Sequence, residues 1–276
     1  MSGVLERTLG ILELLSGHGE GLELASIADR LNMPRSAAHR LLVDLVRCGY
    51  VRQARNKGDY MLTTKLVSMG LSYLSNSGIV DIAQPLLNHL AELSGELVRL
   101  SVVDGECLTW VARAQGARQG LRYDPDMGSV ARLSCSSSGW AWLSTLPDDD
   151  ALALLAKQGL GQPQDFGPNA PTSLQAVMAQ VAATRQQGYS LTVDTYSLGL
   201  SAMSAPVRLA ALPAMGVLTL AGPTVRFTEA RMRELAPELL SVCAQLAAAS
   251  GASPFFAQTS PASPTTAVGR QPIYAP

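Results

Sequence analysis

Residues 34–51 read PRSAAHRLLVDLVRCGYV, and the interpretation of the whole chain depends on this stretch. Proline is favoured at the first position of a helix, where no backbone N–H is needed, and Gly49 is the expected stop. The stretch therefore predicts one amphipathic helix that starts and ends sharply. Its inward face is predicted from apolar residues at helical spacing: Leu41, Leu42, Leu45 and Val46.

The opposite face of this helix carries polar donors on its first turns, without an acidic neighbour. These donors are Arg35, Ser36, His39 and Arg40. A helix with such donors at its N-terminal end suits the major groove of DNA. An ordinary solvated helix face has the same composition, so the flanking sequence has to decide between the two.

The flanks favour a DNA-binding unit. Upstream, residues 22–33 read LELASIADRLNM and predict a second amphipathic helix, joined to the first by a short turn at Asn32 and Met33. Two helices joined by so tight a turn form a helix-turn-helix. Downstream, residues 50–63 read YVRQARNKGDYMLT, which predicts two short strands around a turn at residues 56–59. This hairpin is the wing of a winged helix.

The basic residues are concentrated in this unit. Residues 34–60 hold six Lys and Arg against Asp44 and Asp59, although the whole chain has a net charge of −1. When such a local excess of cations neutralises DNA phosphates, counterions are released, and this release favours binding. We therefore predict a DNA-binding domain over residues 1–63. Its expected contacts with duplex DNA are Arg35, Ser36, His39, Arg40, Arg52, Arg55 and Lys57.

Around this unit the chain continues as helices. Residues 64–78 predict a linker helix that is also a candidate pairing surface, and residues 79–94 predict another amphipathic helix. Residues 4–16 predict the first helix of the chain. Its expected inward residues are Leu5, Leu9, Leu12 and Leu15.

The second half mixes strands and helices. The Asp104-Gly105 dipeptide is a strong hairpin signal, and hairpins rather than regular βαβ units indicate an α+β domain over residues 79–251. From residue 252 the chain is rich in Ser, Thr, Pro and Ala, which predicts a disordered tail over residues 252–276. The expected strands are residues 98–103, 107–112, 120–123, 189–193, 202–209 and 216–221. The expected helices are residues 148–158, 172–188 and a final one from residue 229.

Composition excludes several classes of protein. The 276 residues suffice for two domains, and the four cysteines lie far apart without CxxC spacing, so we expect reduced thiols and no metal site. The sequence has no leader of signal type and no apolar run long enough to span a bilayer. We therefore expect a cytoplasmic protein that needs no cofactor.

Taken together, these segments resemble the IclR family of bacterial transcriptional regulators from about residue 5 to residue 251. The resemblance implies a winged helix-turn-helix, a linker helix and an effector-binding domain related to the GAF fold, with an antiparallel sheet. It also implies homodimers, often paired as dimers of dimers, on palindromic operators. The resemblance is carried by the helix pair above and by ERTLGILELL, VVDGE, SGWAWLSTLP, RQQGYS, LGLSAMSAPV and the AGP before RFTEARM.

The family places a small-molecule site in the second domain, and the resemblance carries its walls onto four segments. A helix N-terminus presents unpaired N–H groups that suit a carboxylate, and the serines of CSSSGW add donors; plain capping by Ser134 or Ser136 is the alternative. The implied residues are Tyr123, Asp126 and Met127; Cys135, Ser136, Ser137 and Ser138; Asp194, Tyr196 and Ala202; Thr219 and Ala221.

Departures from the family pattern bear on the ligand. Trp140 follows Gly139 where the family usually has Lys, Trp142 comes two residues later, and Ser201 replaces a common Arg. Fewer charges and more aromatic rings favour an aromatic acid, sensed to control a catabolic operon, and add Trp140 to the expected site. A short aliphatic oxoacid is the alternative, and core packing is the other interpretation of the tryptophans.

Two other classes of function compete with a regulator. An enzyme would need a nucleophile and a base, yet the three histidines (His18, His39 and His89) all precede the serine cluster and no hydrolase elbow is present, so no catalytic residue is expected. A winged helix that binds only proteins is opposed by the basic residues of the helix and the wing. Activation and repression of transcription both remain open.

Overall fold

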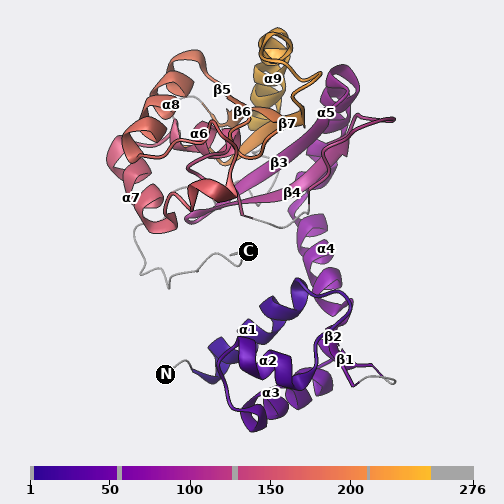
Figure 1. Cartoon of the computed structure of the whole chain (residues 1–276). Coiled ribbons are helices and arrows are strands. Elements are labelled where there is room, and N and C mark those ends of the chain that lie inside the picture. Colours follow the sequence, from indigo (N-terminus) through magenta and orange to yellow (C-terminus); the bar gives the residue numbers. More distant parts are fainter. Residues whose placement is uncertain (1–2, 55–57, 126–129, 210–211, 250–276) are drawn as a thin grey trace. The chain divides into compact units, whose positions relative to one another are not determined.

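The computed structural model describes residues 3–54, 58–125, 130–209 and 212–249, and Figure 1 shows its helices and strands. The chain divides into two compact units after Asn76. Within the ranges just given, no helix combines the length and apolar character that crossing a membrane requires.

The first unit is a winged helix-turn-helix. Its core holds Ile11, Leu15, Ile27 and Leu42, each at most 1% exposed. The wing strands pair antiparallel, and Leu22 bridges to Tyr60 beside them. The elements are α1 (Val4–Ser16), α2 (Leu24–Arg30), α3 (Arg35–Arg47), β1 (Val51–Gln53) and β2 (Tyr60–Leu62), followed by α4 (Lys65–Ser77). The predicted helices and wing are confirmed.

The turn between α2 and α3 depends on local backbone chemistry. Asn32 adopts a left-handed conformation with φ of 47°, which asparagine tolerates better than most residues, and the Met33 N–H donates to the Ala28 carbonyl at 2.9 Å. Pro34 has an extended ψ of 137°, so it precedes α3 rather than opening it. The helix ends at Arg47, two residues before Gly49, whose φ is 78°.

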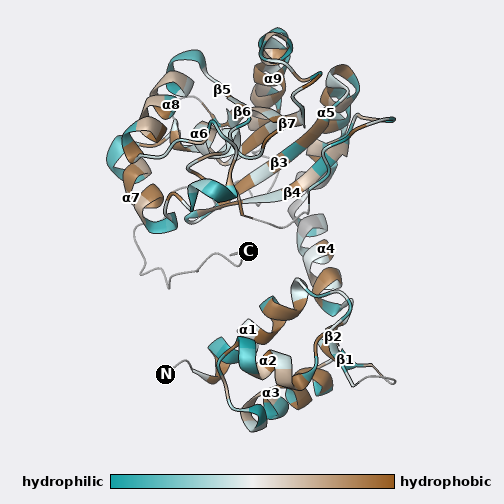
Figure 2. Ribbon diagram, viewed as in Figure 1, coloured by the Kyte–Doolittle hydropathy of each residue, from teal (hydrophilic) through white to brown (hydrophobic). Residues whose placement is uncertain are grey.

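Two predicted inward faces need correction. Val46 is 40% exposed, whereas Ala38 is fully buried, so the core side of α3 is rotated from the prediction. In α1, Leu5 and Leu9 are 72% and 48% exposed. Figure 2 shows that much of α1 is hydrophobic. More than one side of this helix therefore has apolar residues at helical spacing, and the pattern alone does not identify the buried side.

The second unit is an α+β domain with one five-stranded antiparallel sheet of order β4-β3-β7-β6-β5. The α5 helix packs on β3 and β4, α9 packs on β6, and α6 packs on β5, β6 and β7. The elements are α5 (Ile79–Ser94), β3 (Leu97–Asp104), β4 (Cys107–Gln115), α6 (Ser137–Leu143), α7 (Asp148–Gln158), a short 3-10 helix (Pro163–Asp165), α8 (Leu174–Gln187), β5 (Ser190–Val193), β6 (Leu200–Val207), β7 (Gly216–Pro223) and α9 (Glu229–Ala249).

Most predicted strands exist, but residues 120–123 do not form one. Their backbone carbonyls bond to side chains instead of to a neighbouring strand. Gln115 Nε2 donates to the Tyr123 carbonyl at 3.0 Å, and Arg226 Nη1 donates to the Leu121 carbonyl at 2.6 Å. This segment is therefore a loop held beside the end of β4.

The side chains of the sheet alternate between its two faces, and α6 identifies one of them. Ser190 Oγ donates to the Ser137 carbonyl of α6 at 2.7 Å, and the hydroxyls of Ser137 and Ser204 are 2.8 Å apart. Register extends this face across the sheet, because Ser204 pairs with Thr219 and Thr219 pairs with Arg99. We call this side of the sheet the α6 face.

Candidate functional site

Four of the predicted DNA contacts are exposed residues in the N-terminal half of α3, the helix labelled in Figure 1. Residues spaced by four along a helix lie on the same side. In the part of the chain that the structure describes, none of these four side chains forms an ion pair or a hydrogen bond. They are Arg35, Ser36, His39 and Arg40. Their side chains are thus available to a partner.

Val43 continues this exposed side of α3 and was missed by the prediction. It is 49% exposed, although valine is normally a core residue. An apolar side chain on a recognition helix can contact a thymine methyl group in the major groove. A single exposed valine has no signature in sequence, because its helical position alone does not distinguish it from the core.

The wing contributes one described cation, Arg52, whose side chain on β1 is exposed. Gln53 Nε2 donates to the Gly58 carbonyl at 2.9 Å and the Ala54 N–H to the Asp59 carbonyl at 2.8 Å, which shapes the base of the hairpin. The other two predicted wing contacts, Arg55 and Lys57, lie outside the described residues.

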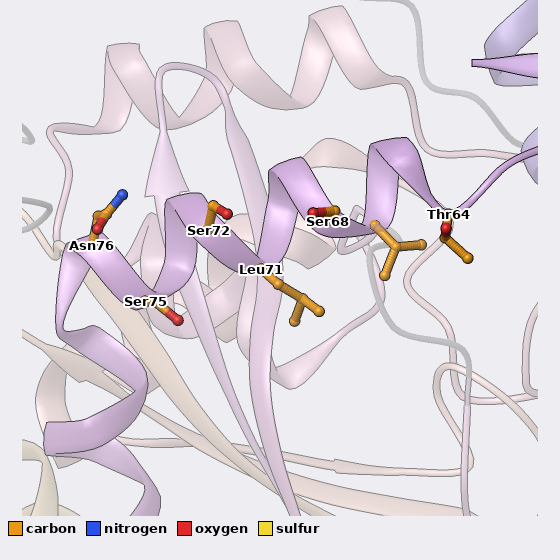
Figure 3. A pocket seen from close by; sticks show the side chains of 7 residues that line it. Thr64, Ser68, Leu71, Ser72, Ser75 and Asn76 are labelled. Carbon is orange, nitrogen blue, oxygen red and sulfur yellow. The ribbon is translucent and has the colours of Figure 1, made fainter. Parts of the chain in front are cut away.

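One side of α4 is an exposed, partly apolar stripe. Val67 and Leu71 are 59% and 60% exposed, and they line an open concavity (Figure 3). Its lining residues recur every three or four positions, which places them on one side of the helix: Thr64, Val67, Ser68, Leu71, Ser72, Ser75 and Asn76. Two of the seven lining side chains are apolar, and the other five carry a hydroxyl or an amide.

In the second unit, the serines at the start of α6 are buried and bonded within the protein. Ser136 Oγ accepts from the Gly139 N–H at 3.0 Å and donates to the Arg132 carbonyl. Ser138 lies 3.2 Å from Ser136, and Ser137 bonds to Ser204. Thr219 joins the same network through Ser204 at 2.8 Å. Ser136 thus caps α6, as the alternative expected for this residue, whereas Ser137 and Ser138 bond to other hydroxyls.

The neighbouring thiol and indole groups are also part of the interior. Burial raises the pKa of the Cys135 thiol to about 11, so this residue is a poor nucleophile. Trp140 is 3% exposed and donates from Nε1 to the Ser134 carbonyl at 3.1 Å. Trp142 is 2% exposed and belongs to the same hydrophobic cluster. The tryptophan pair thus packs in the core, as the second interpretation expected.

Asp194 holds a loop together at the end of β5. Its φ is 51°, and its Oδ1 accepts from the Gly199 N–H at 2.6 Å. Its carbonyl also accepts from the Asn169 N–H at 3.0 Å. These contacts give Asp194 a structural role on the described part of the chain. Two further predicted residues, Asp126 and Met127, lie outside that part.

The α6 face carries a buried cation that the prediction missed. Arg99 is 5% exposed, and its guanidinium carbon lies 3.9 Å from the centroid of the Trp110 ring and 5.8 Å from that of Tyr123. Burial lowers the pKa of Arg99, whereas nearby Tyr123 and Tyr196 act in the opposite direction. Among the described residues, no carboxylate forms an ion pair with it.

Two of the predicted site residues, Tyr123 and Tyr196, lie near this cation. Tyr123 packs against Leu200, Ala202 and Ala221, and Tyr196 lies near Phe166 with 6.4 Å between ring centroids. The structure thus places Tyr123 and Tyr196 near Arg99, and packs Tyr123 against Ala202 and Ala221. We call Arg99, Trp110, Tyr123 and Tyr196 the Arg99 cluster.

The signal that could have found Arg99 was present in the sequence. It is the one charged residue within LVRLSVV, a run of otherwise apolar residues and serine that predicts a buried strand. A buried charge is costly unless it is paired, so a lone arginine in such a strand predicts that its charge has a nearby partner.

Comparisons with known proteins agree with this organisation. Residues 71–248 match the family described as "Bacterial transcriptional regulator IclR C-terminal", and residues 4–55 match the "IclR helix-turn-helix domain". The acetate operon repressor of Salmonella typhimurium is 27% identical over 248 residues, which cover 90% of this chain and 89% of that protein.

Solved structures show the same fold. The IclR transcriptional regulator from Alicyclobacillus acidocaldarius superimposes with a TM-score of 0.79 at 20% identity, covering 91% of this chain and 100% of that chain. An IclR homologue from Microbacterium hydrocarbonoxydans, complexed with 4-hydroxybenzoate, superimposes with a TM-score of 0.76 at 18% identity and with the same coverage.

Proposed function

Because this chain belongs to the IclR family and is a ligand-responsive, DNA-binding transcriptional regulator, we propose that it senses a small aromatic carboxylate. It acts as a cytoplasmic homodimer that controls a catabolic operon from a palindromic operator. The single observation that carries the choice of effector is the buried cation of Arg99, which lies among aromatic rings without a carboxylate partner on the described part of the chain. A homologue of this fold holds 4-hydroxybenzoate, so the fold can accommodate such a ligand.

DNA recognition rests on the exposed side of α3. Arg35, Ser36, His39 and Arg40 read base edges in the major groove or flank them, while Arg52, together with Arg55 and Lys57, holds phosphates. Residues 1–63 thus form the reading head, residues 64–78 the linker helix and residues 79–251 the effector-binding domain. Residues 252–276 belong to neither domain.

Pairing of two copies rests on the α4 stripe. Exposed Val67 and Leu71 lie on one helix side, and a second copy of the same helix would remove both from water. Leu71→Lys should shift the protein from dimer to monomer in light scattering, with little effect on folding because the side chain is 60% exposed. Val225→Lys, at an 84% exposed position of the second unit, is the matched control. An unchanged mass for Leu71→Lys would exclude this pairing surface.

The effector acts by changing a two-state equilibrium. A ligand shifts such an equilibrium only if it binds the two states with different affinities. The linker helix follows the reading head and precedes the effector-binding domain in sequence, so its arrangement in the dimer sets the spacing of the two reading heads.

A mobility-shift titration tests the proposal. The full-length protein should bind the DNA upstream of its own or a neighbouring gene, and benzoate or 4-hydroxybenzoate should change that affinity. Glyoxylate and pyruvate represent the alternative effector class, the short oxoacids. A response to these alone would replace the aromatic effector. No preference for this DNA over random duplex at low salt would favour the winged-helix protein-binding module instead.

A further inference from the structure

Two buried N–H donors of the Arg99 cluster have no acceptor in the part of the chain that the structure describes. They are Arg99 Nε and Trp110 Nε1, and the two residues are 5% and 7% exposed. A buried donor without an acceptor costs folding free energy, so native proteins rarely keep one without a reason. Here two such donors belong to side chains that stack on each other.

The neighbouring cation has a carboxylate partner, in contrast to Arg99, whose side chain hydrogen-bonds to that of Tyr123. Arg113 lies directly opposite Arg99 across β3 and β4, and its Nη1 donates to Asp124 Oδ1 at 2.7 Å. Trp140 likewise uses its indole N–H within the protein. Over its described residues, the fold therefore supplies acceptors to the half-exposed Arg113 and to the buried Trp140, but none to the two donors of the cluster.

We propose that Arg99 Nε and Trp110 Nε1 together bind the carboxylate of the effector, while its ring packs beside Tyr123, on the apolar surface that Tyr123 forms with Ala202 and Ala221. This assignment rests on the proposed function, because it takes the effector to be an aromatic carboxylate. A carboxylate supplies a counter-charge for the buried guanidinium and has two oxygens that can accept from the two donors. The anion thus binds on the sheet rather than at the serines of α6, whose hydroxyls already have partners.

The first test measures the binding of benzoate, 4-hydroxybenzoate and phenylacetate to the full-length protein by calorimetry and thermal shift. Trp110→Phe keeps an aromatic ring beside Arg99 but removes the indole N–H together with the pyrrole part of the ring system. Arg99→Lys keeps the charge and removes Nε. Each variant should bind the best of these acids at least tenfold more weakly. Arg118→Gln, which alters a cation that is 84% exposed, is the control and should bind as the wild type does.

The second measurement needs no variant that might misfold. In protein labelled with ¹⁵N-tryptophan, the chain gives three indole N–H signals, and saturating benzoate should shift that of Trp110 most. Benzamide, which has the same ring but no charge, should leave this signal unchanged at the same concentration.

The outcomes separate the two levels of the proposal. If an aromatic acid stabilises the protein but binds both variants as tightly as the wild type, and the Trp110 signal does not move, the donor pair is wrong and the proposed effector class stands. If none of the aromatic acids binds while glyoxylate or pyruvate does, the proposed effector class fails. The donor pair then fails as well if Trp110→Phe and Arg99→Lys bind that oxoacid as tightly as the wild type, and stands if both bind it at least tenfold more weakly.

Discussion

Arg40→Ala is the substitution that most directly tests how this regulator reads DNA. Arg40 is exposed on α3, and within the described ranges its side chain has no partner. Its removal should therefore change the free energy of unfolding by less than about 0.5 kcal/mol. Any loss of DNA affinity can then be assigned to the interaction with DNA itself rather than to the fold of the reading head.

The expected loss follows from the kind of contact. A bidentate arginine–guanine pair contributes about 1–3 kcal/mol of discrimination, which corresponds to roughly 5- to 150-fold in affinity for one half-site. A dimer on a palindrome makes this interaction twice, so its affinity for the whole operator should fall by a larger factor than the affinity for one half-site. Binding to random duplex should fall far less, because it depends on phosphate contacts.

Fluorescence anisotropy with the operator and with a random duplex of equal length, at one salt concentration, measures both affinities. Arg118→Ala removes the same charge from an exposed position of the second unit and serves as control. If Arg40→Ala lowers the two affinities by the same factor, Arg40 contacts phosphate. The proposal that Arg40 reads a base edge is then refuted.

Three other substitutions test separate parts of the structure. Arg52→Ala should weaken operator and random duplex alike, and should reduce the slope of log K against log salt by about 0.9 for each phosphate that the variant no longer neutralises. Gly139→Ala would place a Cβ 2.6 Å from Leu133 Cα. Such overpacking costs about 1–3 kcal/mol and should lower the melting temperature by roughly 2–12 °C. Gly70→Ala is the control and should not lower it, because its Cβ would have no atom within 4 Å. Because burial raises the pKa of Cys135 to about 11, the unfolded chain releases this proton at lower pH than the folded one. Stability should therefore fall as pH rises from about 9 to 11, by at most about 1.4 kcal/mol per pH unit from this group, and Cys135→Ala should flatten that slope in denaturant titrations.

The reading head could be predicted because its information is local. Its polar donors, its turn and its wing lie within thirty or so consecutive residues, so helical spacing alone brings Arg35, His39 and Arg40 to one side. The predictions that were wrong concern apolar residues of helices that are hydrophobic on several sides. For Leu5, Leu9 and Val46, the spacing is satisfied by more than one orientation, and only packing against the rest of the unit selects between them.

The residues of the candidate effector site are far apart in sequence, which explains why the central ones were not predicted. The sheet order places β3 between β4 and β7, so Arg99 faces Thr219 on one side although 120 positions separate them in sequence. No spacing rule connects such residues, whereas the serines of α6 are consecutive and form a motif that is visible in the sequence. A charge in a buried strand is nevertheless a local observation with a physical cost. A protein that keeps Arg99 buried without a carboxylate partner among its described residues should be stabilised by any small anion that reaches it. The unliganded state is then the less stable one, and the effector contributes its binding energy both to the fold and to the switch.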